Sequence, residues 1–65
     1  MRVIVNGEPA EVSAETLEAA LVELKYGDMT VATALNQGFV PAPQRSATPL
    51  KDGDRIEVIA PMSGG

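Results

Sequence analysis

Apolar and polar residues follow one another along this chain in short patterns that predict its elements. Residues 1–5 (MRVIV) are mostly apolar and β-branched, as in a strand that is covered on both faces. Asn6-Gly7 comes next, and this pair is typical of a tight β-hairpin because both residues tolerate positive φ. Residues 8–12 are then the returning strand. Pro9 has no N–H to donate to a neighbouring strand, which predicts that this strand lies at the edge of a sheet.

An apolar stripe at helical spacing follows the hairpin. Its members recur at i, i+3, i+4 and i+7, and they are Leu17, Ala20, Leu21 and Leu24. Ser13 and Thr16 are both candidates for the N-cap, and Gly27 is placed to end the helix in a left-handed conformation. The pattern therefore predicts a helix from about Thr16 to Tyr26.

The second half of the chain reads as short strands and turns. Residues 30–35 predict a strand, and a turn over 36–38 with Gly38 in a left-handed conformation leads to a brief strand at 39–40. Residues 42–50 have no period and are expected to be irregular. Charged and apolar residues then alternate over 55–60 (RIEVIA), which is the period of a strand.

This order of elements predicts an α+β domain. A hairpin, a crossing helix and a last strand parallel to the first form the β-grasp, or ubiquitin-like, arrangement, in which one helix crosses one face of a mixed sheet. We expect the domain to span residues 1–60 and a flexible, reactive C-terminal tail to span residues 61–65.

Composition narrows the possible functions. The 65 residues include no Cys and no His, which leaves no thiolate nucleophile, no imidazole base and no side chains for a thiolate or imidazole zinc site. A core this small can hardly surround a drug-sized ligand, so we expect no enzyme and no bound cofactor or metal. Asp52 and Asp54 are expected to form a polar turn, and Glu15 and Glu18 a solvated helix face.

The charge balance also restricts the partners. The formal net charge of −4 disfavours nucleic acid and anionic membranes and favours a partner with a basic docking face. No apolar run approaches the ~20 residues of a membrane span, and no secretion signal is evident. We therefore expect a cytoplasmic protein.

The candidate chemistry lies at the end of the sequence, at Gly64-Gly65. A carboxylate needs activation, typically as an acyl-adenylate, before sulfur or an amine can attack it. Glycine has no Cβ, so such a terminus can pass closely through the narrow channel of an activating enzyme. Because the chain has no Cys, a sulfur atom carried by this protein would be bonded to the carbonyl carbon of Gly65.

Other residues near this end are candidates for recognition by a partner. Pro61 ends the last strand and stiffens the tail, and Met62 offers an adaptable apolar contact; each can equally serve only its local structure. Ile59 falls out of phase with the buried positions of its strand and is expected to be exposed. With Ala34 and Phe39 it is a candidate docking patch, although single exposed apolar residues are ordinary.

The chain resembles the ThiS family of sulfur carrier proteins of thiamine thiazole biosynthesis. The resemblance runs nearly end to end and rests on five segments in order, which are MRVIVNGEP, TLEAALVEL, VATALNQGFVP, LKDGDRIEV and VIAPMSGG. It implies that a ThiF-type enzyme adenylates Gly65 with ATP and that a cysteine desulfurase route supplies sulfur for a thiocarboxylate. Thiazole synthase, ThiG, then takes the sulfur. Gly64 is implied as the neighbour of Gly65 in the channel.

The sequence departs from the pattern of the family at one position, and two other functions are kept as alternatives. Family members often have a basic residue directly after the Val-Pro that ends the fourth strand, whereas here Ala42 follows Pro41 and Arg45 is the nearest base. The small subunit of molybdopterin synthase ends in Gly-Gly on the same fold but is usually longer. A ubiquitin-like modifier or interaction module is the alternative from another class. The sulfur donor, the oligomeric state and the docking residues of each partner are left open.

Overall fold

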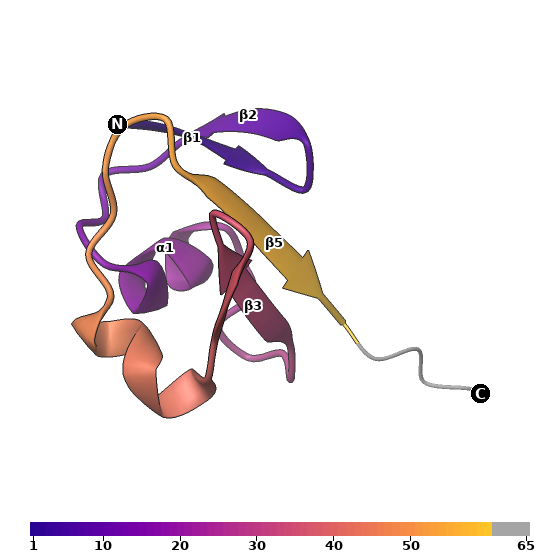
Figure 1. Ribbon diagram of the computed structural model, residues 1–65. Helices are drawn as coiled ribbons and strands as arrows, with labels where there is room; N and C mark the ends of the chain where they lie inside the picture. The colour runs from indigo at the N-terminus through magenta and orange to yellow at the C-terminus, as the bar shows by residue number, and fades with distance from the viewer. Residues whose placement is uncertain (61–65) are drawn as a thin grey trace.

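The protein folds into one five-stranded sheet with an α-helix across one face (Figure 1). The computed structural model describes residues 1–60, and residues 61–65 lie outside the described part. In chain order the elements are β1 (Arg2–Val5), β2 (Glu8–Glu11), α1 (Leu17–Glu23), β3 (Ala32–Leu35), β4 (Gly38–Val40), the 3-10 helix η1 (Ala42–Ala47) and β5 (Arg55–Ile59). The strand order is β2-β1-β5-β3-β4. Strands β1 and β5 are parallel and the other neighbours antiparallel, which confirms the β-grasp prediction.

The first hairpin forms as its turn residues predict. Asn6 and Gly7 both have positive φ, at 50° and 86°, which joins β1 and β2 through a tight turn. Val5 is the partner of Glu8 beside the turn, and Ile4 is the partner of Pro9. Strand β2 lies at the sheet edge, so the missing N–H of Pro9 leaves no gap between paired strands.

Helix α1 begins at the predicted cap but ends before the predicted stop. Thr16 is the N-cap, and its side-chain oxygen accepts a hydrogen bond from the Ala19 N–H at 3.2 Å. The last helical residue is Glu23, and Lys25 then takes the left-handed conformation, with φ 74°, that we expected of Gly27.

The reason for the early end is a C-terminal capping motif. The Lys25 N–H donates to the Val22 carbonyl and the Tyr26 N–H to the Leu21 carbonyl, at 3.1 and 2.8 Å. These are the two bonds of a Schellman motif, and the half-buried Tyr26 ring packs against the core directly after it. Burial of the ring offsets the strain of a lysine with positive φ.

Two further expectations about the second half are corrected. In the second hairpin Asn36 and Gln37 have the positive φ values, 50° and 75°, and Gly38 already belongs to β4. Residues 42–47, expected to be irregular, form η1, in which the fixed φ of a proline suits the first turn. Each of the five strands otherwise matches its predicted range within two residues at each end.

The core lies between α1 and the inner face of the sheet. Its largest fully buried side chains are Leu17, Ile56, Val3 and Thr33. Burying one large aliphatic side chain stabilises the fold by about 1.5–3 kcal/mol. Along β5, Ile56 and Val58 are buried while the residues between them are exposed, as the alternating pattern predicts. None of the helices found within residues 1–60 is long and apolar enough to span a lipid bilayer.

Candidate docking surface at the end of the last strand

The strand register places the three predicted docking residues on one face of the sheet. Ala34 of β3 is the direct partner of Phe39 on β4 and of Glu57 on β5, and Ala32 is the partner of Ile59. Directly paired residues project from the same face, and residues two apart on a strand do so as well. We call Ala32, Ala34, Phe39 and Ile59 the outer patch. It lies opposite α1, because the intervening Thr33 is buried on the inner face.

The outer patch exposes large apolar side chains. Phe39 is 71% exposed and Ile59 is 66% exposed, whereas Ala34 between their strands is half-buried. Nothing within residues 1–60 covers the two large side chains. In the register, Ala34 and the exposed Glu57 lie between Phe39 and Ile59. Exposed apolar residues gathered on one sheet face are typical of a surface that binds another protein. The geometry thus brings the predicted residues together and leaves their role as a proposal.

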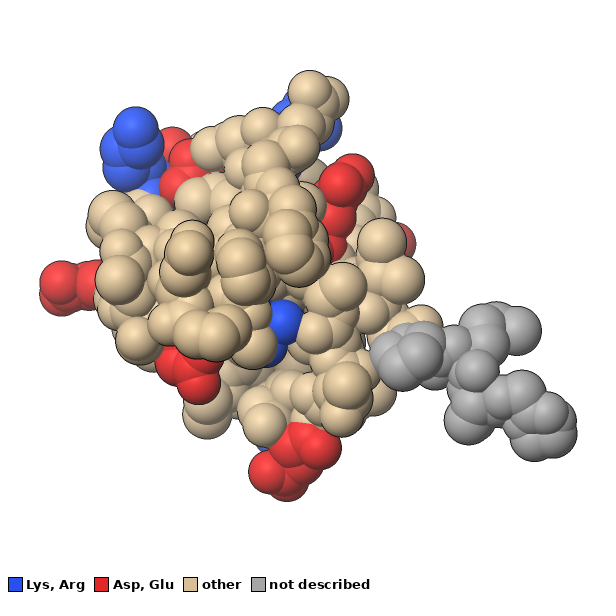
Figure 2. Space-filling model, turned by 60° about the horizontal axis from the view of Figure 1, so that its bottom comes forward, with Lys and Arg blue, Asp and Glu red and all other residues tan. Residues whose placement is uncertain are grey.

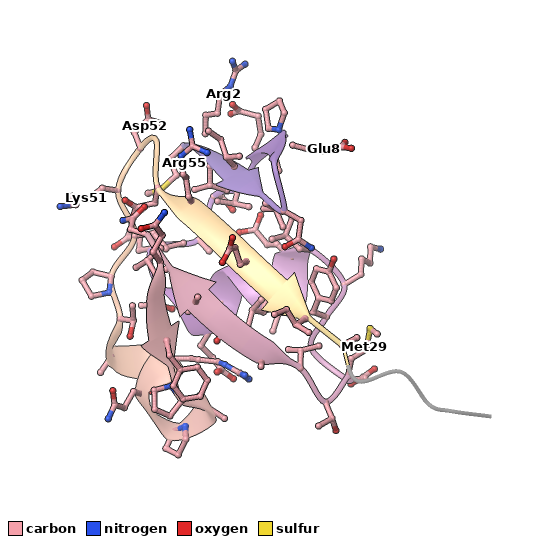
Figure 3. All side chains as sticks on the ribbon, turned by 45° about the vertical axis from the view of Figure 1, so that its right-hand side comes forward. Arg2, Glu8, Met29, Lys51, Asp52 and Arg55 are labelled. Atoms are coloured by element: carbon pink, nitrogen blue, oxygen red, sulfur yellow. The ribbon has the colours of Figure 1, made fainter. Side chains whose placement is uncertain are left out.

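The two ends of β5 differ in the charge of the side chains that lie near them (Figure 3). Arg2, Lys51, Asp52 and Arg55 gather at the end where β5 starts, and Arg2 forms an exposed ion pair with Glu11 at 3.2 Å. Met29 lies at the opposite end, where β5 finishes, and is 49% exposed. The end of β5 from which the chain continues into residues 61–65 is therefore the more apolar end.

Sequence reasoning missed two residues of this region. Ala32 belongs to the outer patch because it is two residues from Ala34, so strict alternation within 32–35 would have found it. Met29 lies in the loop between Tyr26 and β3, where no periodicity exists and only the folded chain brings it to the end of β5.

The final residues of the sequence hold the remaining predicted site. Gly65 and Gly64, with Pro61 and Met62, lie outside the described residues. Their predicted roles in activation and recognition stay predictions. The structure describes the strand that leads to them, which ends at Ile59 and is paired there with Ala32 of β3.

Two acidic side chains, Asp54 in the turn before β5 and Glu23 at the end of α1, serve the fold. The buried carboxylate of Asp54 accepts hydrogen bonds from the Asn36 side-chain amide at 3.0 Å and from the Lys51 N–H at 2.7 Å. These bonds, the Asn36 bond most of all, lower the pKa of Asp54 below its ordinary value. The exposed Glu23 carboxylate accepts from the Ser13 N–H and hydroxyl, and the backbone bond lowers the pKa of Glu23. Ser13 therefore binds Glu23 and is not the helix cap.

Comparison with known proteins places this β-grasp chain in a family. The family model described as ThiS family matches residues 3–65. The sulfur carrier protein ThiS of Thermus thermophilus is 38% identical over 60 residues, which covers 92% of this chain and 94% of that protein. A crystal structure of the thiamine biosynthesis protein ThiS from Geobacter metallireducens superimposes with a TM-score of 0.79 at 36% identity, covering 100% of both chains. The chain belongs to the ThiS family.

A second curated relative is much longer than this chain. The thiazole synthase of Paramagnetospirillum magneticum is 36% identical over 66 residues, which covers 100% of this chain. The chain spans only 20% of the length of that relative. A segment similar to this whole chain is thus part of a protein named thiazole synthase.

Proposed function

We propose that this chain carries sulfur as a thiocarboxylate on Gly65 and delivers it to thiazole synthase. Membership of the ThiS family makes the chain a sulfur carrier of thiamine biosynthesis. The match of the family model extends through residue 65 and so includes the terminal Gly64-Gly65 pair, which is the observation that carries the proposal. The protein is a cosubstrate: partner enzymes modify its terminal carboxylate, and the chain returns to the carboxylate form when the sulfur is transferred.

The chemistry needs only the terminal carboxylate of the chain. A carboxylate oxygen of Gly65 attacks the α-phosphorus of ATP on a ThiF-type enzyme, and pyrophosphate leaves. The terminal sulfur of a persulfide, supplied through a cysteine desulfurase, then attacks the carbonyl carbon and displaces AMP, which leaves the chain joined to the partner enzyme through an acyl disulfide. A second thiol of the partner enzymes attacks the other sulfur of this S–S bond, so that the thiocarboxylate leaves and a disulfide forms in the partner. The sequence has no Cys to hold the sulfur and no His to act as a base, so the partner enzymes supply the groups that transfer protons.

Two partners are proposed on different grounds. The relative from Paramagnetospirillum magneticum supports thiazole synthase, because one polypeptide of that name contains a segment similar to this chain. The ThiF-type enzyme is proposed because the carboxylate has to be activated. We propose that the outer patch docks on these partners, with Pro61, Met62 and Gly64 contacting the channel that receives Gly65. The exposure of Ile59 at the end of β5, and of Phe39 on β4 on the same face of the sheet, supports this surface.

Intact-protein mass spectrometry tests the proposal. The chain is incubated with ATP, a ThiF-type enzyme and a sulfur source, beside a control chain that lacks Gly65. We expect a mass gain equal to the replacement of one oxygen by one sulfur, located at Gly65 and absent from the control. An unchanged mass, with an enzyme shown to be active on another carrier, would contradict the proposal. Stable high-mass amide conjugates in cells would support a ubiquitin-like modifier instead.

A further inference from the structure

Arg45 of η1 is held in place by neutral groups of the sheet. Its Nε donates to the Thr33 hydroxyl oxygen at 2.9 Å, and its Nη2 donates to the Val31 carbonyl at 2.6 Å. The Thr33 hydroxyl in turn donates to the Val40 carbonyl at 2.9 Å. The guanidinium group is thereby fixed against the start of β3 and the end of β4.

The positive charge of Arg45 has no carboxylate partner within residues 1–60. The ion pair found in that part of the chain joins Arg2 and Glu11. Arg45 is half-buried, so it has given up part of its hydration, and neutral acceptors return less than a carboxylate would. A guanidinium group has five N–H donors, and these two bonds leave three of them for another acceptor.

The fixed charge lies at the end of the sheet from which residues 61–65 continue. Val31 directly precedes Ala32, which is the partner of Ile59, the last residue of β5. The side of the molecule that carries η1 comes forward in Figure 2, and much of the surface shown there is uncharged. Arg55, in contrast, is at the start of β5, at the far end of that strand.

We propose that Arg45 is a preorganised contact for a carboxylate side chain of the partner that receives the C-terminal segment, taken here as thiazole synthase. This inference rests on the proposed function. A planar guanidinium with its orientation already fixed can bind a carboxylate through two parallel bonds with little further loss of side-chain entropy. In a chain of net charge −4, one fixed cation near the end of β5, on the inner-face side of the sheet, orients the docked molecule. That orientation directs residues 61–65 into the receiving channel.

Binding of matched charge variants to intact thiazole synthase tests the contact. Arg45→Gln and Arg55→Gln each remove one positive charge. Arg55 is the first residue of β5, whereas Arg45 is bonded to Val31 beside the pair of Ala32 with Ile59 at the other end of that strand. We expect Arg45→Gln to raise Kd by roughly tenfold to a hundredfold, as for loss of a hydrogen bond to a charged group. We expect Arg55→Gln to change Kd by less than about twofold and to keep the dependence of Kd on salt. Equal Kd values for the two folded variants would overturn the proposal.

A second measurement uses the unaltered chain, so that an unfolded variant cannot obscure the result. Arginine-labelled protein is observed by NMR, and the Arg45 side-chain signals are assigned as those that remain in both the Arg2→Gln and the Arg55→Gln variants. We expect the Arg45 Nη signals to shift and their protons to exchange more slowly with water when thiazole synthase is added. Unchanged signals in a complex that forms would overturn the proposal. If phosphate alone causes the same shift, Arg45 binds small anions, and the proposal that it contacts a carboxylate of the partner is overturned.

The mass measurement on Gly65 separates the two proposals. A chain that gains sulfur normally, but whose Arg45→Gln variant binds thiazole synthase as tightly as Arg55→Gln, contradicts the Arg45 contact alone. A chain that gains no sulfur at Gly65 contradicts the proposed function itself.

Discussion

The side chain of Asn6 forms two hydrogen bonds with the backbone of Val58. The Val58 N–H donates to Asn6 Oδ1 at 2.8 Å, and Asn6 Nδ2 donates to the Val58 carbonyl at 3.1 Å. The paired residues of β1 and β5 end at Val5 and Ile56, so the amide of Asn6 continues the ladder for one more step. A turn residue near the start of the chain therefore helps to hold the strand that leads to the C-terminal segment.

We predict that Asn6→Gly destabilises the fold by about 1–3 kcal/mol, because the variant keeps a residue suited to positive φ but loses both bonds to Val58. The measurement is the free energy of unfolding in urea. Gln37→Gly is the control. It also replaces a residue of positive φ in a hairpin turn by glycine, but Gln37 has no bonds like those of Asn6 to Val58. Equal stability of Asn6→Gly and the unaltered chain would show that the bonds contribute nothing.

We predict that Lys25→Gly stabilises the protein by about 0.5–1 kcal/mol. Lys25 has a φ of 74°, where a Cβ is strained, and glycine takes this conformation without that cost. The gain is reduced by the larger entropy of glycine in the unfolded chain. Thermal and urea denaturation measure the effect. Lys51→Gly, at a position without positive φ, removes the same charge and serves as the control, in which no gain is expected.

The Asp54 carboxylate makes stability depend on pH. Because hydrogen bonds lower the pKa of Asp54 in the folded state, its contribution is complete above the unfolded pKa of about 4 and is lost as the pH falls through the folded pKa. We predict that Asp54→Asn is less stable than the unaltered chain by about 1–3 kcal/mol at pH 7. The difference should shrink below about pH 4. A difference that stays constant from pH 7 to pH 2 would contradict this account.

The outer patch should serve binding and not stability. We predict that Phe39→Ser and Ile59→Ser weaken binding to thiazole synthase by tenfold or more, through the loss of buried apolar area, while stability changes by about 0.5 kcal/mol or less. Val22→Ser is the matched control, because Val22 is 62% exposed but belongs to α1, on the other face of the sheet. Titration calorimetry measures the binding. Equal losses for Val22→Ser and Phe39→Ser would remove the outer patch as the docking surface.

The sequence predicted those parts of the fold that local chemistry determines. The Asn6-Gly7 turn, the edge position of Pro9 and the Thr16 cap each depend on one residue and its near neighbours. The alternation over 55–60 likewise separated the buried Ile56 from the exposed Ile59. These features could be recognised without knowledge of the folded chain.

Features that depend on contacts between distant segments could not be predicted. Gly27 was expected to end the helix, but packing of Tyr26 on the core moves the left-handed residue to Lys25. The bonds that fix Arg45 join η1 to β3, and no local pattern in residues 42–50 indicates them. The position of Met29 beside the end of β5 also arises only in three dimensions.

The most direct test of the central claim is a single-turnover transfer of labelled sulfur. The chain carrying isotope-labelled sulfur as the Gly65 thiocarboxylate is mixed with thiazole synthase and its other substrates, without ATP or a sulfur source. We predict that the label appears in the thiazole product while the chain returns to the mass of its carboxylate form. Label that stays on Gly65 while an active synthase completes its turnover with another carrier would contradict the claim that this chain delivers sulfur.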